Sequence, residues 1–230
     1  MNVAAIVPVK TLDTAKSRLD AQLNADERGR LALWLLGRVA DALGSSGAIG
    51  ATAVVSPDAA VLAWARVAGL AALPQEAGDL NTAVALGSAW AHRLGAGALL
   101  VTLGDLPFLT GSEVRALIAR GTTLARCEVP GRSGVAVLAP DRAGTGTNAL
   151  FVTPPAALPF VFGFGSRQRF TALAAQAGVA LAAFQSPGTA FDVDGADDLS
   201  LLRRRMRWPA TGLGGIPPLP RQGRGHERTA

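Results

Sequence analysis

The sequence predicts an α/β fold of three layers, in which a mostly parallel sheet lies between two layers of helices. Short apolar runs alternate with stretches of helical periodicity as far as residue 202. The run 97–107 is apolar almost throughout, as in a strand buried on both faces. A chain of 230 residues with 49% apolar content is long enough for a well-buried core. In such folds, ligand-binding loops lie at the carboxyl ends of parallel strands.

The first half of the chain reads as strands and helices in alternation. Apolar runs predict strands over 3–9, 51–56, 70–73 and 97–107. Helices are predicted over 24–43, 58–68, 80–94 and 110–120. Asn24 and Thr110 are residue types that cap helices, and each stands at a predicted helix start.

The pattern changes after Gly121. Two apolar runs, GVAVLAPDR and TNALFVTP, are separated by the polar, Gly-rich DRAGTGTN. A helix over 166–177, a strand over 179–184 and a last helix to about Arg207 complete the pattern. We expect a single domain over 1–207. The segment 208–230 is rich in Arg, Gly and Pro without apolar periodicity, which predicts a disordered tail.

Charge and cysteine content exclude several classes of protein. The net charge is +5, but from Arg203 onward there are seven Arg and one Glu, so the basic character belongs to the tail. We therefore expect no nucleic-acid partner. The single Cys127 excludes an internal disulfide and a multi-cysteine metal site. No apolar stretch of membrane-spanning length and no charged leader is present, which predicts a cytoplasmic protein without a membrane partner.

Both lysines of the chain, Lys10 and Lys16, lie just after the first predicted strand and close to Arg18. All other basic residues are arginines. Compact ammonium groups at the end of a strand suit phosphate binding. A solvated loop that happens to contain lysine is an equally good interpretation of this feature alone.

Asp105 is the sharpest individual signal, because it stands where the buried run 97–107 ends. Asp192 or Asp194 of FDVDGADDL could join it, and paired carboxylates suit Mg²⁺, which keeps several waters and bridges to phosphates. Capping of the next helix is the alternative for Asp105, but Thr110 fills that position better. Asp197 and Asp198 are better explained as acids that stabilise a helix start.

Two Gly-rich segments could bind anions. DRAGTGTN offers backbone N–H groups and the hydroxyls of Thr145 and Thr147, although such a loop is often only a hairpin turn. FGFGSRQR places glycines before Ser166, at the start of a predicted helix. Plain capping by Ser166 is as good an interpretation as ligand binding.

Missing motifs narrow the chemistry. The sequence contains no G-x-G-x-x-G after its first strand, no Walker sequence and no G-x-S-x-G elbow. His92 falls within a predicted helix and His226 within the tail, which argues against a histidine base. Lys, Arg and paired Asp favour phosphoryl or nucleotidyl transfer, where catalysis depends on positioning and charge neutralisation.

These residues resemble the guanylyltransferases that activate a phosphorylated three-carbon acid in deazaflavin coenzyme biosynthesis. The resemblance covers nearly all of residues 3–202. The matching pieces are VPVK with AKSRL, VVSPD, the LN of GDLNTAV, the DLP of LGDLPFL, APDRAGTGTNAL, FGFGS and DVDGADDL. The family looks related to the sugar-nucleotide and molybdopterin nucleotidyltransferases, so the resemblance implies a nucleotide-diphospho-sugar transferase-like fold.

The resemblance also implies roles for individual residues. Lys10, Lys16 and Arg18 would handle the GTP triphosphate, and Asn81 would lie near the nucleoside. Asp105, with Asp192 or Asp194, would bind Mg²⁺. Thr147, Gly163 and Ser166 would hold the acid's carboxylate and phosphate. The chain departs from the family pattern at Gly104, where Ala is usual, and at Phe170, where His is frequent.

The implied activity is transfer of GMP from GTP to phosphoenolpyruvate, 2-phospho-L-lactate or 3-phospho-D-glycerate, with release of pyrophosphate. A downstream deazaflavin transferase would be the partner that consumes the product. Two alternatives stay open at this point. One is a nucleotidyltransferase acting on a sugar phosphate or molybdopterin, and the other is a non-catalytic nucleotide-binding module.

Overall fold

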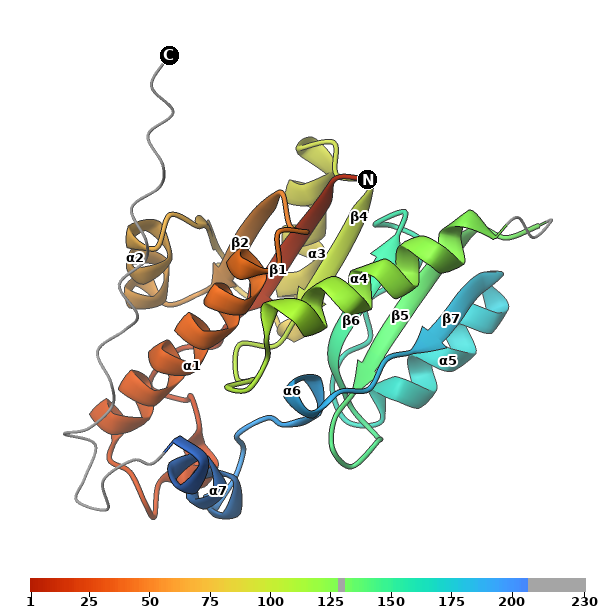
Figure 1. The fold of residues 1–230 in the computed structure, drawn as a ribbon. Helices are drawn as coiled ribbons and strands as arrows, with labels where there is room; N and C mark the ends of the chain where they lie inside the picture. The colour runs from red at the N-terminus through yellow and green to blue at the C-terminus, as the bar shows by residue number, and fades with distance from the viewer. Residues whose placement is uncertain (128–130, 207–230) are drawn as a thin grey trace.

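A computed structural model describes residues 1–127 and 131–206 of the chain, drawn as a ribbon in Figure 1. The predicted tail, 208–230, lies outside these residues. The strands are β1 (Val3–Pro8), β2 (Ala51–Ser56), β3 (Ala71–Pro74), β4 (Ala98–Thr102), β5 (Gly134–Pro140), β6 (Thr147–Thr153) and β7 (Val179–Ala183). The helices are α1 (Ala25–Ser45), α2 (Ala59–Val67), α3 (Leu80–Arg93), α4 (Gly111–Arg126), α5 (Ser166–Gln176), α6 (Pro187–Ala190) and α7 (Ala196–Met206), with a 3₁₀ turn at Ser17–Leu19.

The strands form one sheet in the order β3-β2-β1-β4-β6-β5-β7. Pairing is parallel from β3 to β4 and between β5 and β7, whereas β6 runs antiparallel to both β4 and β5. The predicted mostly parallel sheet is therefore confirmed, with β4 at its centre, although β4 ends at Thr102 and covers only part of the strand predicted over 97–107. DRAGTGTN is the turn of a β5–β6 hairpin, as one of its two interpretations required.

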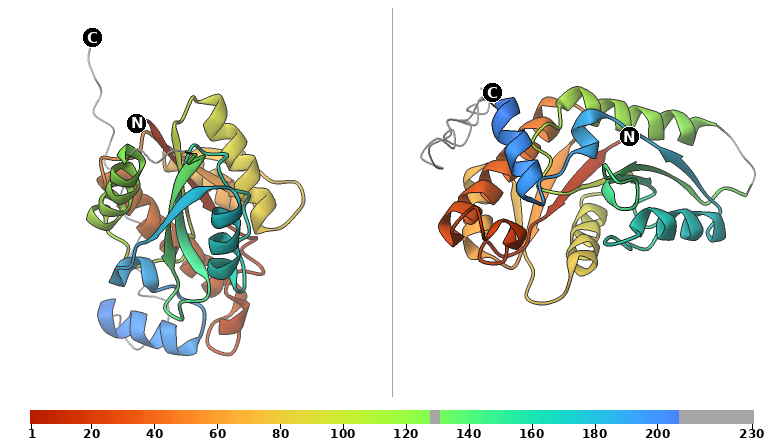
Figure 2. Two further views of the ribbon diagram at one scale, coloured as in Figure 1. Left: turned by 90° about the vertical axis from the view of Figure 1, so that its right-hand side faces the viewer. Right: turned by 90° about the horizontal axis from the view of Figure 1, so that it is seen from below.

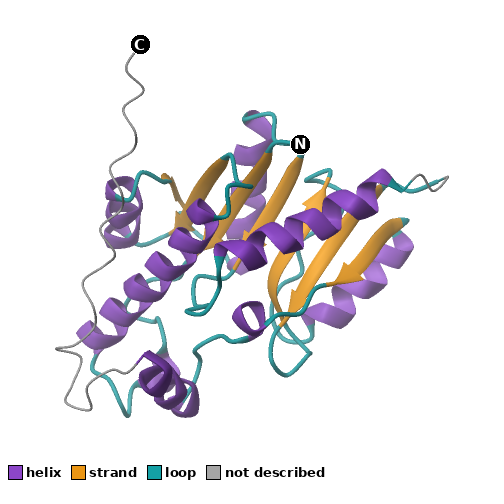
Figure 3. Cartoon of the chain, viewed as in Figure 1, coloured by secondary structure: helices purple, strands orange, loops and turns teal. Residues whose placement is uncertain are grey.

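Helices cover both faces of the sheet, which gives the three predicted layers (Figures 2 and 3). The alternation of side chains along β1 shows how this arises. Val3, Ala5 and Val7 pack with α1, α2 and α4, while Ala4 and Ile6 face α3 and α5. Burying a side chain such as Ile6 in full stabilises the fold by roughly 1.5–3 kcal/mol.

Helix starts follow the predicted caps. Asn24 and Thr110 each close a capping box, with Glu27 and Glu113 as the reciprocal partners. The end of α4 differs from the prediction, because the helix continues to Arg126 instead of stopping near Arg120.

Gly121 is the reason that the predicted end was wrong. It is a buried position inside α4, and a Cβ there would overlap the ring of Phe151 on β6. Glycine lets the helix approach the sheet closely, at a cost of about 1 kcal/mol in helix propensity. A glycine that looks like a helix stop in the sequence is therefore a packing contact in the fold.

A third apolar cluster lies away from the sheet and positions two loops. Leu19 and Leu23, which follow Lys16 in the chain, pack with Leu35 of α1 and Leu199 of α7. Val193, between the two aspartates of DVD, belongs to the same cluster. The basic loop after β1 and the DVD segment are thus held on one shared core. None of the helices in the described part is long and apolar enough to cross a membrane.

Candidate functional site

Three segments that are distant in the sequence meet beyond the carboxyl ends of β1 and β4. The loop after β1 carries Lys16, the loop after β4 carries Asp105, and the segment between α6 and α7 carries Asp192 and Asp194. The backbone N–H of Val193 donates to the backbone carbonyl of Asp105 at 3.2 Å. This bond fixes the DVD segment directly against the β4 loop.

Lys16 is the centre of the carboxylate cluster, by which we mean Lys16, Asp105, Asp192 and Asp194. Its Nζ lies 2.6 Å from Asp105 Oδ2 and 3.6 Å from Asp194 Oδ1. The Lys16 side chain is only 10% exposed, so the pair with Asp105 is poorly screened by water. Arg18 Nη1 reaches Asp194 Oδ2 at 3.5 Å from the solvent side, with its side chain 78% exposed.

Burial and the charges of neighbouring groups together govern the ionisation of Asp192 and Lys16. Burial raises the pKa of Asp192, and the neighbouring Asp105 and Asp194 raise it further, to about 6. Burial lowers the pKa of Lys16, but the attraction of Asp105, Asp194 and Asp192 outweighs it, so that pKa lies above its ordinary value. The site therefore holds more negative charge than Lys16 alone can neutralise.

The backbone of Lys16 is also unusual. Its φ is 52° and its ψ is 35°, the left-handed conformation that non-glycine residues seldom adopt. Such a residue costs about 1 kcal/mol or more and persists only where the surroundings hold it. The buried contact with Asp105 is such a restraint, and it directs the ammonium into the cluster.

The cluster has the donors that a hard cation requires. Oδ1 of Asp105 is buried and has no hydrogen-bond partner, although a buried carboxylate oxygen is normally satisfied. Asp192 and Asp194 offer further carboxylate oxygens beside it. Within residues 1–127 and 131–206, however, no group of three or more His, Cys, Asp or Glu side chains forms a complete metal set. One or two carboxylates are the usual protein ligands of Mg²⁺, which takes its remaining ligands from water and phosphate, so Asp105 with Asp192 or Asp194 fits this ion.

Lys10 and Asn81 lie apart from this cluster. Lys10 is exposed just beyond β1, and it forms no ion pair with the described carboxylates. Asn81, at the start of α3, accepts a hydrogen bond from Phe162 N at 2.7 Å and donates to Phe162 O at 3.3 Å. The structure thus places Asn81 against the segment that leads into Gly163.

A second group of predicted residues, which we call the acceptor cradle, consists of Thr147, Gly163 and Ser166. Ser166 Oγ donates to Thr147 Oγ1 at 2.9 Å, and both residues are buried. Gly163 has a φ of 114°, which a side chain would not tolerate. The hydroxyl pair joins the β6 start to the α5 start, so the two Gly-rich segments lie together.

The capping interpretation of Ser166 is wrong. Gly165 occupies the N-cap position with a φ of 68°, and Ser166 is the first residue of α5, with its side chain turned to Thr147. Phe170, the other departure in this region, is fully buried and packs edge-on against Phe162 with ring centroids 5.2 Å apart. Phe170 is therefore a core residue beneath the cradle.

Two residues at predicted helix starts also make long-range contacts that support the site and that the sequence did not predict. Asp58 caps α2 through Ala60 N and also accepts from Leu12 N at 2.8 Å, which anchors the basic loop. Asp198 accepts from the backbone N–H groups of Asp194 and Gly195, as expected of an acid at a helix start. Asp198 also forms an ion pair with Arg142, and no short sequence motif predicts that contact.

Comparison with solved structures shows the fold. The chain is similar to a putative nucleotide-diphospho-sugar transferase from Desulfovibrio desulfuricans, with a TM-score of 0.70 and 16% identity over 89% of this chain and 88% of that one. It is also similar to a nucleotidyl transferase from Methanothermobacter thermautotrophicus, with a TM-score of 0.62 and 12% identity over 90% and 98% of the two chains. The predicted nucleotide-diphospho-sugar transferase-like fold is confirmed.

Comparison of sequences shows the family. The phosphoenolpyruvate guanylyltransferase of Rubrobacter xylanophilus is 45% identical, over 88% of this chain and 94% of the relative. That of Sphaerobacter thermophilus is 44% identical, over 88% and 93%. Residues 3–203 match the family described as guanylyl transferase CofC like. The chain therefore belongs to this family of guanylyltransferases, and it is an enzyme of the nucleotidyltransferase class.

Proposed function

We propose that the protein transfers GMP from GTP to phosphoenolpyruvate, with release of pyrophosphate, in deazaflavin coenzyme biosynthesis. 2-Phospho-L-lactate and 3-phospho-D-glycerate are the alternative acceptors. We choose phosphoenolpyruvate because both relatives are named phosphoenolpyruvate guanylyltransferase. They align with 88% of this chain over 94% and 93% of their own lengths. A downstream deazaflavin transferase would consume the activated product.

One observation carries the proposal. The buried ammonium of Lys16 lies between the carboxylates of Asp105 and Asp194, so negative charge exceeds positive charge there, as suits the binding of a cation. In the proposed reaction an acceptor phosphate oxygen forms a bond to the α-phosphorus of GTP. The bond from that phosphorus to the bridging oxygen breaks, and pyrophosphate leaves with the electron pair. An acceptor phosphate is already ionised at neutral pH, so no proton has to be removed and no histidine base is needed.

The residues of the chain have the following roles in this proposal. Lys16 and Arg18 neutralise the triphosphate, and Lys10 and Asn81 complete nucleotide binding as the family resemblance implies. Thr147 donates its hydroxyl hydrogen to the acid, Ser166 orients that hydroxyl through its own hydrogen bond to Thr147, and Gly163 lets the backbone approach the acid. Asp105 with Asp192 or Asp194 would hold Mg²⁺, which would supply charge neutralisation at the transferring phosphate.

Pyrophosphate release tests the proposal. The protein is incubated with Mg²⁺ and each of ATP, CTP, GTP and UTP, together with phosphoenolpyruvate, 2-phospho-L-lactate, 3-phospho-D-glycerate or a sugar phosphate. We expect rapid release only with GTP and one of the three acids, and a product whose mass equals the acid plus GMP minus water. Release with CTP and a sugar phosphate, or nucleotide binding without any release, would contradict the proposal.

A further inference from the structure

Both carboxylate oxygens of Asp198 accept hydrogen bonds, and the residue is only 8% exposed. Its Oδ2 accepts from the backbone N–H groups of Asp194 at 3.0 Å and Gly195 at 2.9 Å. Its Oδ1 accepts from Arg142 Nη2 at 2.6 Å. One side chain therefore holds the turn that carries the aspartates of DVD and, at the same time, the tip of the β5–β6 hairpin.

A helix-start acid does not need the second contact. Asp197, the neighbouring acid in the first turn of α7, is exposed and makes no such bond to the turn. Asp198, by contrast, has a cationic partner, Arg142, from another part of the chain.

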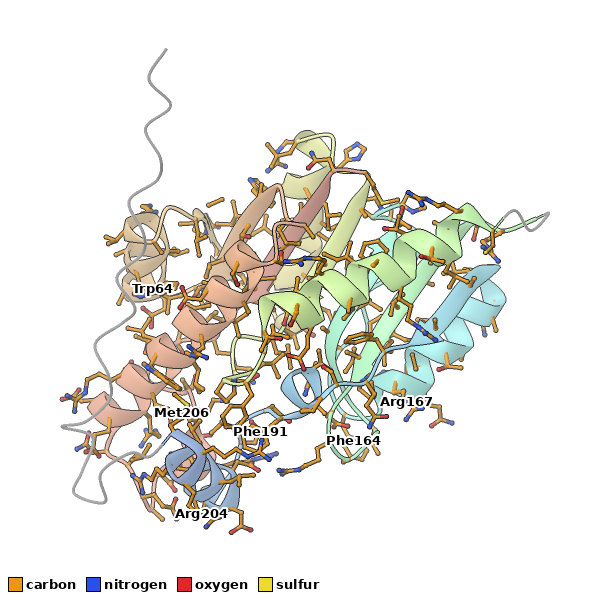
Figure 4. All side chains as sticks on the ribbon, in the orientation of Figure 1. Trp64, Phe164, Arg167, Phe191, Arg204 and Met206 are labelled. Atoms are coloured by element: carbon orange, nitrogen blue, oxygen red, sulfur yellow. The ribbon has the colours of Figure 1, made fainter. Side chains whose placement is uncertain are left out.

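Arg142 lies in a turn that is held by hydrogen bonds. Asp141 accepts from Thr145 N at 2.8 Å through its side chain and from Gly144 N at 3.0 Å through its carbonyl. The Arg142 guanidinium also lies over the ring of Phe191, 5.4 Å from its centroid. In the view of Figure 4, Phe191 is seen between α7, which carries Arg204, and the cradle side, where Phe164 and Arg167 lie.

The same hairpin holds the DVD segment from a second point. Asn148, next to Thr147 of the acceptor cradle, donates to Thr189 O at 3.1 Å and to Asp192 Oδ1 at 3.4 Å. Arg142 acts on one side of the segment through Asp198, and Asn148 acts on the other side directly. A displacement of the hairpin would therefore move both aspartates relative to Asp105.

We infer that Arg142 and Asp198 are positioning residues that couple the acceptor cradle to the carboxylate cluster. This inference rests on the proposed function, because it assigns the cradle to the acid and the cluster to the cation. Groups that orient metal ligands without touching the metal typically change affinity or rate by about 10–100-fold when removed. Arg142 lies on the hairpin that carries part of the acceptor cradle, and Asp198 holds the turn of the carboxylate cluster, so the pair links both sides of the site.

The test compares Arg142→Gln and Asp198→Asn with two matched controls, Arg204→Gln and Asp197→Asn. Arg204 is exposed on α7, so its loss removes the same charge nearby without breaking the pair. The readouts are kcat, KM for GTP, KM for phosphoenolpyruvate, the melting temperature, and Mn²⁺ binding to the GTP-bound protein by electron paramagnetic resonance.

We expect Arg142→Gln and Asp198→Asn to lower kcat/KM for the acid by about 10–100-fold and to weaken Mn²⁺ binding by about tenfold. KM for GTP should stay within about twofold of the wild-type value in both variants. In the two control variants, the kinetic constants and Mn²⁺ binding should also stay within about twofold of the wild type. The double variant should lose no more kcat/KM or Mn²⁺ affinity than the more impaired of the two single variants, because the same contact is lost in all three. Arg142→Lys should recover part of the loss, since it keeps the charge but not the planar fork.

Three outcomes would overturn the inference: Arg142→Gln indistinguishable from Arg204→Gln in rate and Mn²⁺ binding, losses that multiply in the double variant, or equal changes in KM for GTP and for the acid. If Asp198→Asn has a much lower melting temperature, the inference is tested with Arg142→Gln alone. The Arg142 side chain is 59% exposed, so its removal should leave the fold intact. If the wild type transfers no guanylyl group, the proposed function fails, while Mn²⁺ binding still tests the coupling.

Discussion

The two sides of the site are held in different ways. In the acceptor cradle, the buried hydroxyls of Thr147 and Ser166 satisfy one another at 2.9 Å. In the carboxylate cluster, Asp105 keeps a buried oxygen without a partner, and Asp192 has a pKa of about 6 because its carboxyl is buried and neighbouring carboxylates repel its charge. The hydroxyls of the cradle satisfy one another, whereas the cluster gathers three carboxylates around one buried ammonium.

This comparison indicates where catalysis should be most sensitive. Removing a group from the satisfied side leaves one hydrogen-bonding partner unpaired, which costs about 1–3 kcal/mol. Removing a carboxylate from the charged side deprives Lys16 of a partner and, under the proposed function, removes a ligand of the cation.

Asp105→Asn should have the largest effect. The loss of the central carboxylate should lower kcat by about a thousandfold, because electrostatic stabilisation of the transferring phosphate depends on it. Circular dichroism and size-exclusion profiles should match the wild type, since Asn has the same shape. The measurement is pyrophosphate release with GTP and phosphoenolpyruvate at saturating Mg²⁺.

Asp26→Asn is the control for this change, because Asp26 is an exposed acid at the start of α1. It should retain nearly full activity. If Asp105→Asn also retained near-normal activity, the carboxylate cluster would not be the cation site, and the contrast between the two sides would be lost.

Ser166→Ala should have an intermediate effect. It removes the partner of the buried Thr147 hydroxyl, so we expect KM for the acid to rise about tenfold, which corresponds to about 1.4 kcal/mol. KM for GTP should stay unchanged, because the contact lies on the cradle side. Steady-state kinetics with each substrate varied in turn would measure both constants.

Thr171→Ala serves as the control for Ser166→Ala, since it removes an exposed hydroxyl from the same helix. We expect it to behave as the wild type. A rise in KM for GTP alone in Ser166→Ala would show that the cradle binds the nucleotide instead of the acid.

Asp58→Ala should have the smallest effect on turnover and a measurable effect on stability. It removes the cap of α2 and the bond to Leu12 N that anchors the basic loop. Loss of such a cap costs about 1 kcal/mol, which urea unfolding at pH 7 would detect. KM for GTP should rise by no more than about threefold, because Lys16 keeps its contact with Asp105.

The pH dependence of this loss follows from the ionisation of Asp58. Burial raises its pKa, but hydrogen bonds from Leu12, Ala60 and Val61 outweigh it, so the pKa lies below the ordinary value. A carboxyl with a lowered pKa stabilises the fold above its unfolded-state pKa and loses that contribution as pH falls through the folded-state value. The difference between Asp58→Ala and the wild type should therefore shrink below about pH 4. A difference that grew on acidification would contradict this account.

Much of the fold could be predicted because its signals are local. The capping boxes of Asn24 and Thr110 span three residues each, and the strand patterns are read within a few positions. The wrong assignments depend on distant partners. Gly121 lies inside a helix at a position where Phe151 of β6 leaves no room for a side chain, and Ser166 caps no helix because its hydroxyl is bonded to Thr147. The short helix α6 was missed altogether, since four residues show no periodicity.

By itself, the sequence determined the alternation of strands and helices, the helix starts and the residue types able to bind phosphate and a hard cation. These depend on backbone sterics, side-chain period and chemical type, which neighbouring residues settle. Only the tertiary structure decided that Lys16 meets a carboxylate 89 residues away and that Arg142 meets one 56 residues away. Such pairs form because sheet order and the core around Val193 bring the loops together, and pairing across that distance leaves no pattern along the chain.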